Sequence, residues 1–244
     1  MTEGKSSCAY NNYCNRVPHK TSSDGHCIFH AKAEDKTVGD FHQALEKYLS
    51  KLRVAKDAVY DFVGFIFPDD IDFKKNFGLN VFEGAGFKDA TFEQDAWFQH
   101  AIFKGITQFD HATFKGDTSF QHATFEQDAL FEHATFEQDA WFQHATFKEM
   151  AYFQYATFNG EAWFLYATFE ETTVFVNAIF EGDTSFLDTI FEGDTLFDRA
   201  RFRETASISP RSVTVEISFS NATVENIAMS PGVDPIGRTL ICQS

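Results

Sequence analysis

Residues 134–149 read ATFEQDAWFQHATFKE, and the phenylalanines in this stretch set the spacing that decides the fold. They are separated by alternating steps of 6 and 5, and the same alternation runs unbroken from Phe92 to Phe202. The pattern therefore repeats at every eleventh position, and Ala or Thr stands two positions before every one of these phenylalanines. A large and a small side chain that recur together at a fixed period are typical of a repeat architecture.

This spacing fits extended strands and excludes a helix. Side chains 5 and 6 positions apart would point about 140° and 240° around a helix, away from a common stripe. In an extended strand, positions i−2 and i share one face, so each Phe and its small neighbour can both point inward. The sequence therefore predicts a β-solenoid of short strands separated by corners. The rhythm continues less regularly beyond both ends of this stretch, at Phe62, Phe67, Phe73, Phe77, Phe82, Phe87, Ile208, Val213, Phe219 and Val224.

The repeat resembles that of the pentapeptide-repeat proteins, whose units read A-(D/N/T)-(L/F)-x-x. Segments such as residues 134–149 and EGDTSFLDTIFEGDTLF (181–197) carry the likeness, which covers about residues 60–226. It implies an all-β fold, a right-handed quadrilateral parallel β-helix with four faces per coil. Because every second step here is longer by one position, we expect position i to stack on position i+22 of the next coil. The extra residue would lie at alternate corners, and seven to eight coils are expected.

In coils of that length, residues 22 positions apart stack on the outer surface. One face then carries Trp97, Trp141 and Trp163, whose indoles we expect to be exposed. An exposed apolar strip indicates a site for a protein partner. The alternative is that the indoles stack across coils and only stiffen the sheet.

The corners of the coils are predicted to be polar. Asp95, Asp117 and Asp139 form an acidic column and are a second candidate surface for a partner. Histidines form two further columns, in which His111 precedes His133, and His100, His122 and His144 continue into Tyr166. These side chains could hydrogen-bond the turns or, as the less favoured alternative, bind a metal ion.

The N-terminal segment carries a different signal. Cys8, Cys14, Cys27 and His30 place four zinc-type ligands between positions 8 and 30. A short segment with little apolar content needs such a metal to fold, so we expect one structural Zn²⁺ per chain. His19 or His26 could take the place of His30. Four protein ligands leave no open position for catalysis.

A capping helix is predicted between this segment and the rod. Its apolar residues follow helical spacing, and Asp40 is the candidate N-cap. The stripe would cover the unpaired edge of the first coil. The predicted organisation is a zinc-finger-like module at 1–38, the capping helix at 39–58, the β-helix at 59–226, and a cap or tail at 227–244. The apolar residues of the helix are Phe41, Ala44, Leu45, Tyr48, Leu49 and Leu52.

The chain of 244 residues has a formal charge of −16, almost all of it on the rod. Residues 77–202 hold 21 acidic and 6 basic side chains, whereas residues 1–76 hold 11 of each. Such a rod is a poor candidate for direct binding to nucleic acid or an anionic membrane. Without an apolar leader or a long apolar run, we expect a cytoplasmic protein. If the protein dimerises, an end of the rod is the expected contact.

No sequence motif indicates catalysis, because G-x-S-x-G, a P-loop and an open metal site are all missing from the sequence. The leading hypothesis is a non-enzymatic scaffold or protein-interaction protein with an unknown partner. The resemblance supplies an alternative, since some pentapeptide-repeat proteins are acidic rods that mimic DNA and modulate type II topoisomerases such as gyrase. A third hypothesis, nucleic-acid binding by the N-terminal module, is less favoured because that region is neutral rather than basic.

Overall fold

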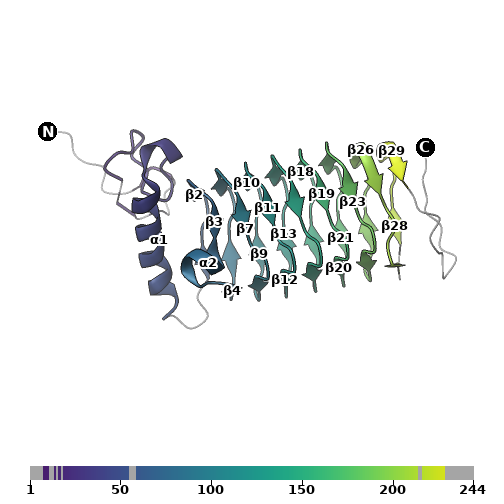
Figure 1. Cartoon of the computed structure of the whole chain (residues 1–244), viewed down its shortest axis with the longest axis horizontal. Coiled ribbons are helices and arrows are strands. Elements are labelled where there is room, and N and C mark those ends of the chain that lie inside the picture. Colours follow the sequence, from purple (N-terminus) through teal and green to yellow (C-terminus); the bar gives the residue numbers. More distant parts are fainter. Residues whose placement is uncertain are drawn as a thin grey trace.

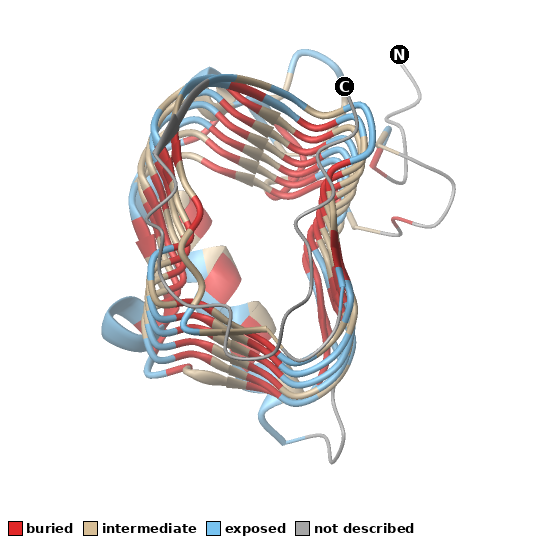
Figure 2. Ribbon diagram, turned by 90° about the vertical axis from the view of Figure 1, so that its right-hand side faces the viewer, coloured by how far each residue is buried: buried red, intermediate tan, exposed pale blue. Residues whose placement is uncertain are grey.

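The structure is a computed structural model that describes residues 8–10, 14, 16–17, 19–54, 59–213 and 216–228. A rod of stacked coils runs from Tyr60 to Ala228, and a small helical region covers its N-terminal end (Figure 1). Viewed along its axis the rod is four-sided, and buried residues line the inside of each side (Figure 2). The predicted parallel β-solenoid is confirmed, with about seven turns.

Each side of the rod is a ladder of short parallel strands. The first side contains β2 (Ile66–Phe67), β6 (Thr91–Phe92), β10 (Thr113–Phe114), β14 (Thr135–Phe136), β18 (Thr157–Phe158) and β22 (Ile179–Phe180). The second side, called here the tryptophan face, contains β3 (Ile71–Asp72), β7 (Ala96–Trp97), β11 (Thr118–Ser119), β15 (Ala140–Trp141), β19 (Ala162–Trp163) and β23 (Thr184–Ser185). The longer β26 (Arg201–Ser207) pairs with both of these sides, and β29 (Thr223–Ala228) pairs with β26.

Two further ladders complete the coil. The third side contains β4 (Val81–Phe82), β8 (Ile102–Phe103), β12 (Thr124–Phe125), β16 (Thr146–Phe147), β20 (Thr168–Phe169), β24 (Ile190–Phe191) and β27 (Ser212–Val213). The fourth side lies opposite the tryptophan face and contains β1 (Tyr60–Asp61), β5 (Ala85–Gly86), β9 (Thr107–Gln108), β13 (Ala129–Leu130), β17 (Ala151–Tyr152), β21 (Thr173–Val174), β25 (Thr195–Leu196) and β28 (Ile217–Ser218).

The strand register confirms the predicted length of the coil. Thr113 pairs with Thr135, and Trp141 pairs with Trp163, so partners in successive coils differ by 22 in number. The first coil is longer, since Ile71 pairs with Ala96. The extra residues form a one-turn helix, α2 (Phe73–Phe77), between β3 and β4. Phe77, expected as part of the repeat, therefore belongs to this helix.

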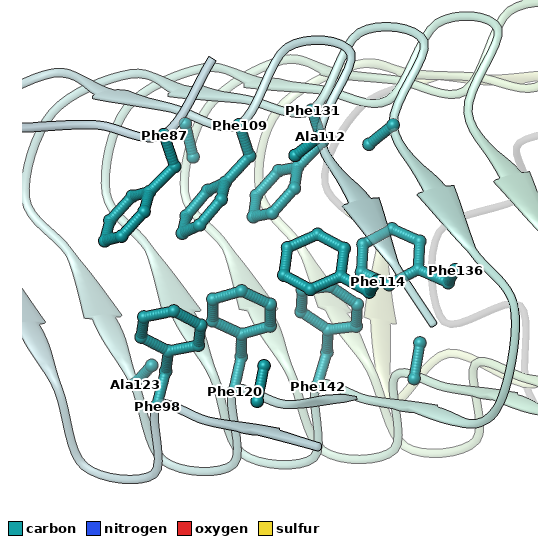
Figure 3. Packing of buried hydrophobic residues seen from close by; sticks show 14 of the residues in the cluster. Phe87, Phe98, Phe109, Ala112, Phe114, Phe120, Ala123, Phe131, Phe136 and Phe142 are labelled. Carbon is teal, nitrogen blue, oxygen red and sulfur yellow. The ribbon is translucent and has the colours of Figure 1, made fainter. Parts of the chain in front are cut away.

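Stacked phenylalanines fill the interior of the rod. The rings of Phe114 and Phe136 are nearly parallel, 4.8 Å apart between centroids, which is the spacing of neighbouring strands (Figure 3). Within a coil the rings meet edge to face, as Phe131 and Phe142 do at 5.8 Å and 88°. Ala134, two residues before Phe136, is fully buried beside this column. Each large ring and its small neighbour thus point inward, as predicted.

The alternation of shorter and longer steps produces two kinds of corner. In the shorter step, Ala101 N–H donates to the carbonyl of Phe98 at 3.1 Å, and His100 has φ 57°. This is the geometry of a type II turn, which needs a left-handed residue at its third position. In the longer step, a side chain helps to close the corner, because Asp95 Oδ1 accepts a hydrogen bond from the Asp117 amide of the next coil at 2.9 Å.

The helical region closes the open end of the first coil. It comprises a 3₁₀ turn, η1 (Ala33–Asp35), and the helix α1 (Val38–Leu52). Phe41, Leu45 and Leu49 are fully buried on α1, and Tyr48 packs on Phe62 of the first coil at 6.1 Å. The predicted apolar stripe is therefore the contact surface.

The N-cap of α1 differs from the prediction. Thr37, not Asp40, caps the helix, because its hydroxyl oxygen accepts a hydrogen bond from the Asp40 amide at 3.1 Å. Asp40 lies in the first turn, where its negative charge interacts favourably with the positive end of the helix dipole. Both residue types are common at helix starts, which is why the sequence did not separate them. The predicted C-terminal cap or tail at 227–244 lies largely outside the described residues.

Candidate metal centre and tryptophan face

Four buried side chains converge in the N-terminal region. The ligand atoms of Cys8, Cys14, Cys27 and His30 all lie within 4.8 Å of one another. Cys14 Sγ is 3.9 Å from Cys27 Sγ, and His30 Nδ1 is 3.3 Å from Cys8 Sγ and 3.4 Å from Cys27 Sγ. Zinc–ligand bonds of about 2.0–2.3 Å place tetrahedral ligands about 3.5–3.8 Å apart. The donor set and its spacing therefore fit a tetrahedral zinc ion.

Local backbone structure brings these ligands together. A tight turn follows Cys27, whose carbonyl accepts hydrogen bonds from the amides of His30 at 3.0 Å and Ala31 at 2.8 Å. The Cys27 amide donates to Cys8 Sγ at 3.1 Å, which joins the two cysteine loops. The predicted alternatives to His30 are not part of the cluster, and His19 Nδ1 instead pairs with the hydroxyl of Thr21 at 2.8 Å.

Contacts of His30 connect the cluster to the rod. Its Nε2 lies 3.0 Å from the carbonyl oxygen of Val63, in the first coil. A proton on Nε2 leaves Nδ1 as the acceptor that faces the three thiols, an arrangement common around metal-bound histidines. Tyr10 stacks on the imidazole at 4.0 Å. Burial lowers the pKa of His30 to about 4, so the ring is neutral at pH 7 and available as a ligand.

The thiols are chemically suited to a metal as well. Burial raises the pKa of Cys27 to about 12, so this thiol stays protonated at neutral pH unless a cation favours its thiolate. The distance of 3.9 Å between the sulfurs of Cys14 and Cys27 excludes a disulfide, whose sulfurs are about 2.05 Å apart.

The three tryptophans lie together on the tryptophan face. They are half-buried, whereas exposed indoles were predicted. Trp97 and Trp141, two coils apart, stack with their ring centroids 5.9 Å from each other. Ser119 lies between them in register and is fully buried. Trp163 donates its indole N–H to Glu161 Oε2 at 3.0 Å. The small Ser119 between Trp97 and Trp141 therefore allows these two rings to stack over the sheet.

The carboxylates of the acidic column form hydrogen bonds between successive coils. Asp95 and Asp139 each accept a backbone N–H of the next coil at 2.9 Å, from Asp117 and Glu161. Burial raises the pKa of Asp117, and its hydrogen bond with the Asp139 backbone opposes that shift. The aspartates of this column therefore hydrogen-bond the backbone at the corners. The histidine columns also stack as predicted, with His100 and His122 at 4.9 Å and His111 and His133 at 4.8 Å.

Comparison with known proteins addresses the rod itself. The family described as pentapeptide repeats (9 copies) matches residues 98–146, 131–178 and 153–201. Residues 98–201 are pentapeptide repeats. No curated protein and no solved structure matches the chain.

The candidate metal centre and α1 lie outside the pentapeptide-repeat match. In this region the structure shows a role for Lys36 that was not predicted from the sequence. Its Nζ is buried and donates to the carbonyls of Ile28 at 3.0 Å and Ile66 at 2.5 Å. These bonds join the turn after Cys27 to β2 of the rod. Burial lowers the pKa of Lys36 to about 7. Nothing in the sequence predicts this role, because lysines are almost always exposed.

The helices give no sign of a membrane segment. Within the described residues, none is long and apolar enough to cross a bilayer. The longest, α1, has 15 residues, whereas a spanning helix needs about 20.

Proposed function

We propose that this pentapeptide-repeat rod is a non-catalytic binding scaffold whose protein partner docks on the tryptophan face. The observation that carries the proposal is the stacked pair of Trp97 and Trp141. All three tryptophans of the chain lie on this one side, whereas the first side presents a row of threonines. Half-buried aromatic residues that are already fixed in place lose little entropy on binding, which is typical of interface anchors.

The experiment compares two sets of variants in capture of a partner from the native host. Trp97→Ala with Trp141→Ala should abolish capture, since loss of an anchor typically costs about 2 kcal/mol or more. Replacing Asp95, Asp117 and Asp139 together by Asn should weaken capture only modestly, because Asn keeps an oxygen that can accept the corner N–H.

The opposite pattern would favour the alternative, a DNA mimic that modulates gyrase. In that case the Asn variant should lose binding, the tryptophan variant should keep it, and the protein should inhibit supercoiling. Binding should also fall steeply with salt, because charges are screened over about 8 Å at physiological ionic strength. The corner hydrogen bonds give the aspartates a structural explanation, which is why we favour the tryptophan face.

We also infer that Cys8, Cys14, Cys27 and His30 hold one structural Zn²⁺, whose bonds would supply stability that this short region lacks. Protein purified without a tag or added metal should contain close to one equivalent of zinc by elemental analysis. Cys27→Ala should lose the metal, whereas Cys242→Ser, which leaves all four candidate ligands in place, should keep it. Chelation should loosen the N-terminal region first and leave the β signal of the rod. A metal-free protein with freely reactive thiols would contradict the inference.

A further inference from the structure

A polar cleft lies at the N-terminal end of the tryptophan face. It measures about 310 Å³, and one wall is the indole of Trp97. The remaining walls come from α2, β3 and the corners next to β3 and β7, namely Asp70, Asp72, Lys75, Asn76 and Gln99. The cleft exists because α2 interrupts the first coil beside β3, and the buried Phe73 and Phe77 anchor α2 to the rod.

A hydrogen bond to the backbone fixes the carboxylate of Asp72, which lines the cleft together with Trp97. Asp72 and Trp97 are register partners, so they occupy the same outward column in successive coils. Asp72 Oδ1 accepts the Lys75 amide at 2.8 Å as the N-cap of α2, and the Asp72 amide donates to Asn76 Oδ1 at 2.8 Å. Asp70 Oδ1 accepts the Asp95 amide at 3.3 Å. Both carboxylate groups thus use Oδ1 to accept these amides.

The chemistry of this cleft is that of a cation site. Trp97 offers an indole, and Asp70 and Asp72 offer two negative charges against the single positive charge of Lys75. One cationic group would therefore neutralise the cleft. A guanidinium fits best, because it stacks on an indole and pairs with a carboxylate at the same time.

We propose, on the basis of the proposed function, that this cleft binds an arginine side chain on an extended segment of the partner protein. From Trp97 to Trp163 the face spans three coil steps of about 4.8 Å, which matches about four residues of extended chain. The acidic rod, with 21 acidic and 6 basic residues in 77–202, attracts a basic segment and repels nucleic acid. The segment would place its arginine in the cleft and its apolar side chains on Trp141 and Trp163.

The test uses the whole chain and its own fluorescence. All three tryptophans lie on this face, so tryptophan emission reports on it alone. The probes are acetylated, amidated tetra-arginine and the matched tetra-citrulline peptide, which has the same shape without the charge. At about 0.15 M salt, tetra-arginine should change the emission saturably and tetra-citrulline should not.

Asp72→Asn tests the assigned carboxylate, because Asn also caps helices and should preserve α2. This variant should weaken tetra-arginine binding about tenfold, the loss typical of a charge-assisted hydrogen bond. Asp128→Asn is the matched control. Like that of Asp72, its carboxylate accepts one backbone amide, here that of Met150 in the next coil at 3.2 Å, but Asp128 stands before β13 on the opposite side. The control should bind as the unchanged protein does.

Equal weakening by Asp72→Asn and Asp128→Asn would reveal diffuse charge attraction and overturn the proposal. Absence of a saturable response to tetra-arginine would overturn it as well. Either result leaves the proposed function open to its own test. That test compares capture of the partner by the unchanged protein and by the tryptophan variants, and it uses no arginine peptide. If the tryptophan variants lose capture but tetra-arginine gives no change in emission, the face binds a partner of different chemistry.

Discussion

Phe142 shows what each phenylalanine contributes to the rod. It stacks on Phe120 at 5.0 Å and on Phe164 at 4.8 Å, and it meets Phe131 edge-on within its own coil. The ring is fully buried, as is the small Ala140 beside it. Since neighbouring rings hold one another in register, they have little freedom to fill a cavity in the column.

Phe142→Ala should therefore lower the free energy of unfolding by about 3–5 kcal/mol, the cost of a large cavity in a rigid core. Thr135→Ser, at a half-buried outward position, should change it by less than about 0.5 kcal/mol. Denaturant unfolding followed by far-UV circular dichroism measures both. Similar losses for the two variants would contradict the inward assignment of the phenylalanines.

The corner histidines mark the limit of prediction from single residues. The period of the repeat predicted that His100 and His122 stack, and their rings are 4.9 Å apart. It did not predict their backbone, which has φ values of 57° and 56°. Residues other than Gly are strained there by about 1–2 kcal/mol. Gly78, which ends α2, has this conformation without that strain.

At the scale of elements, the periodicity of the sequence predicted the features that depend only on which way the side chains point. The apolar stripe of α1 and the alternating steps of the rod both follow from side-chain direction, so both were readable from the sequence. The α2 insertion was not, because Phe73 and Phe77 are spaced much like the less regular residues around them. The cluster of Cys8, Cys14, Cys27 and His30 could be predicted from residue type and spacing. The role of Lys36 could not, because it depends on the carbonyl groups to which Lys36 donates.

The N-cap of α1 provides a test at this scale. Thr37→Ala should destabilise the helix by about 1 kcal/mol, since it removes the acceptor for the Asp40 amide. Asp40→Ala should cost about 0.5 kcal/mol, the value of a charge near a helix N-terminus. Amide hydrogen exchange along α1 measures both, and Thr37→Ser should restore protection. A larger loss for Asp40→Ala would restore Asp40 as the cap.

At the scale of the whole molecule, the chain combines a capped end with a rigid, repetitive surface. His30 and Lys36 bind carbonyls of the first coil, and the Phe29 carbonyl accepts the Ile66 amide, so several hydrogen bonds fix the N-terminal region to the rod. Behind this cap, the register places Trp97, Trp141 and Trp163 in one row. The period alone predicted this row, but not the stack of Trp97 on Trp141, which depends on how side chains lean across Ser119. None of these sequence patterns identifies the partner protein.

The most direct test of the scaffold proposal is to find which side of the rod the partner touches. A photo-crosslinking benzoylphenylalanine would replace Trp163 on the tryptophan face or Tyr152 on the opposite side, each an aromatic residue in a two-residue strand. After illumination with the captured partner, the Trp163 replacement should form the adduct and the Tyr152 replacement should not. Adducts from Tyr152 alone, or equally from both, would contradict docking on the tryptophan face.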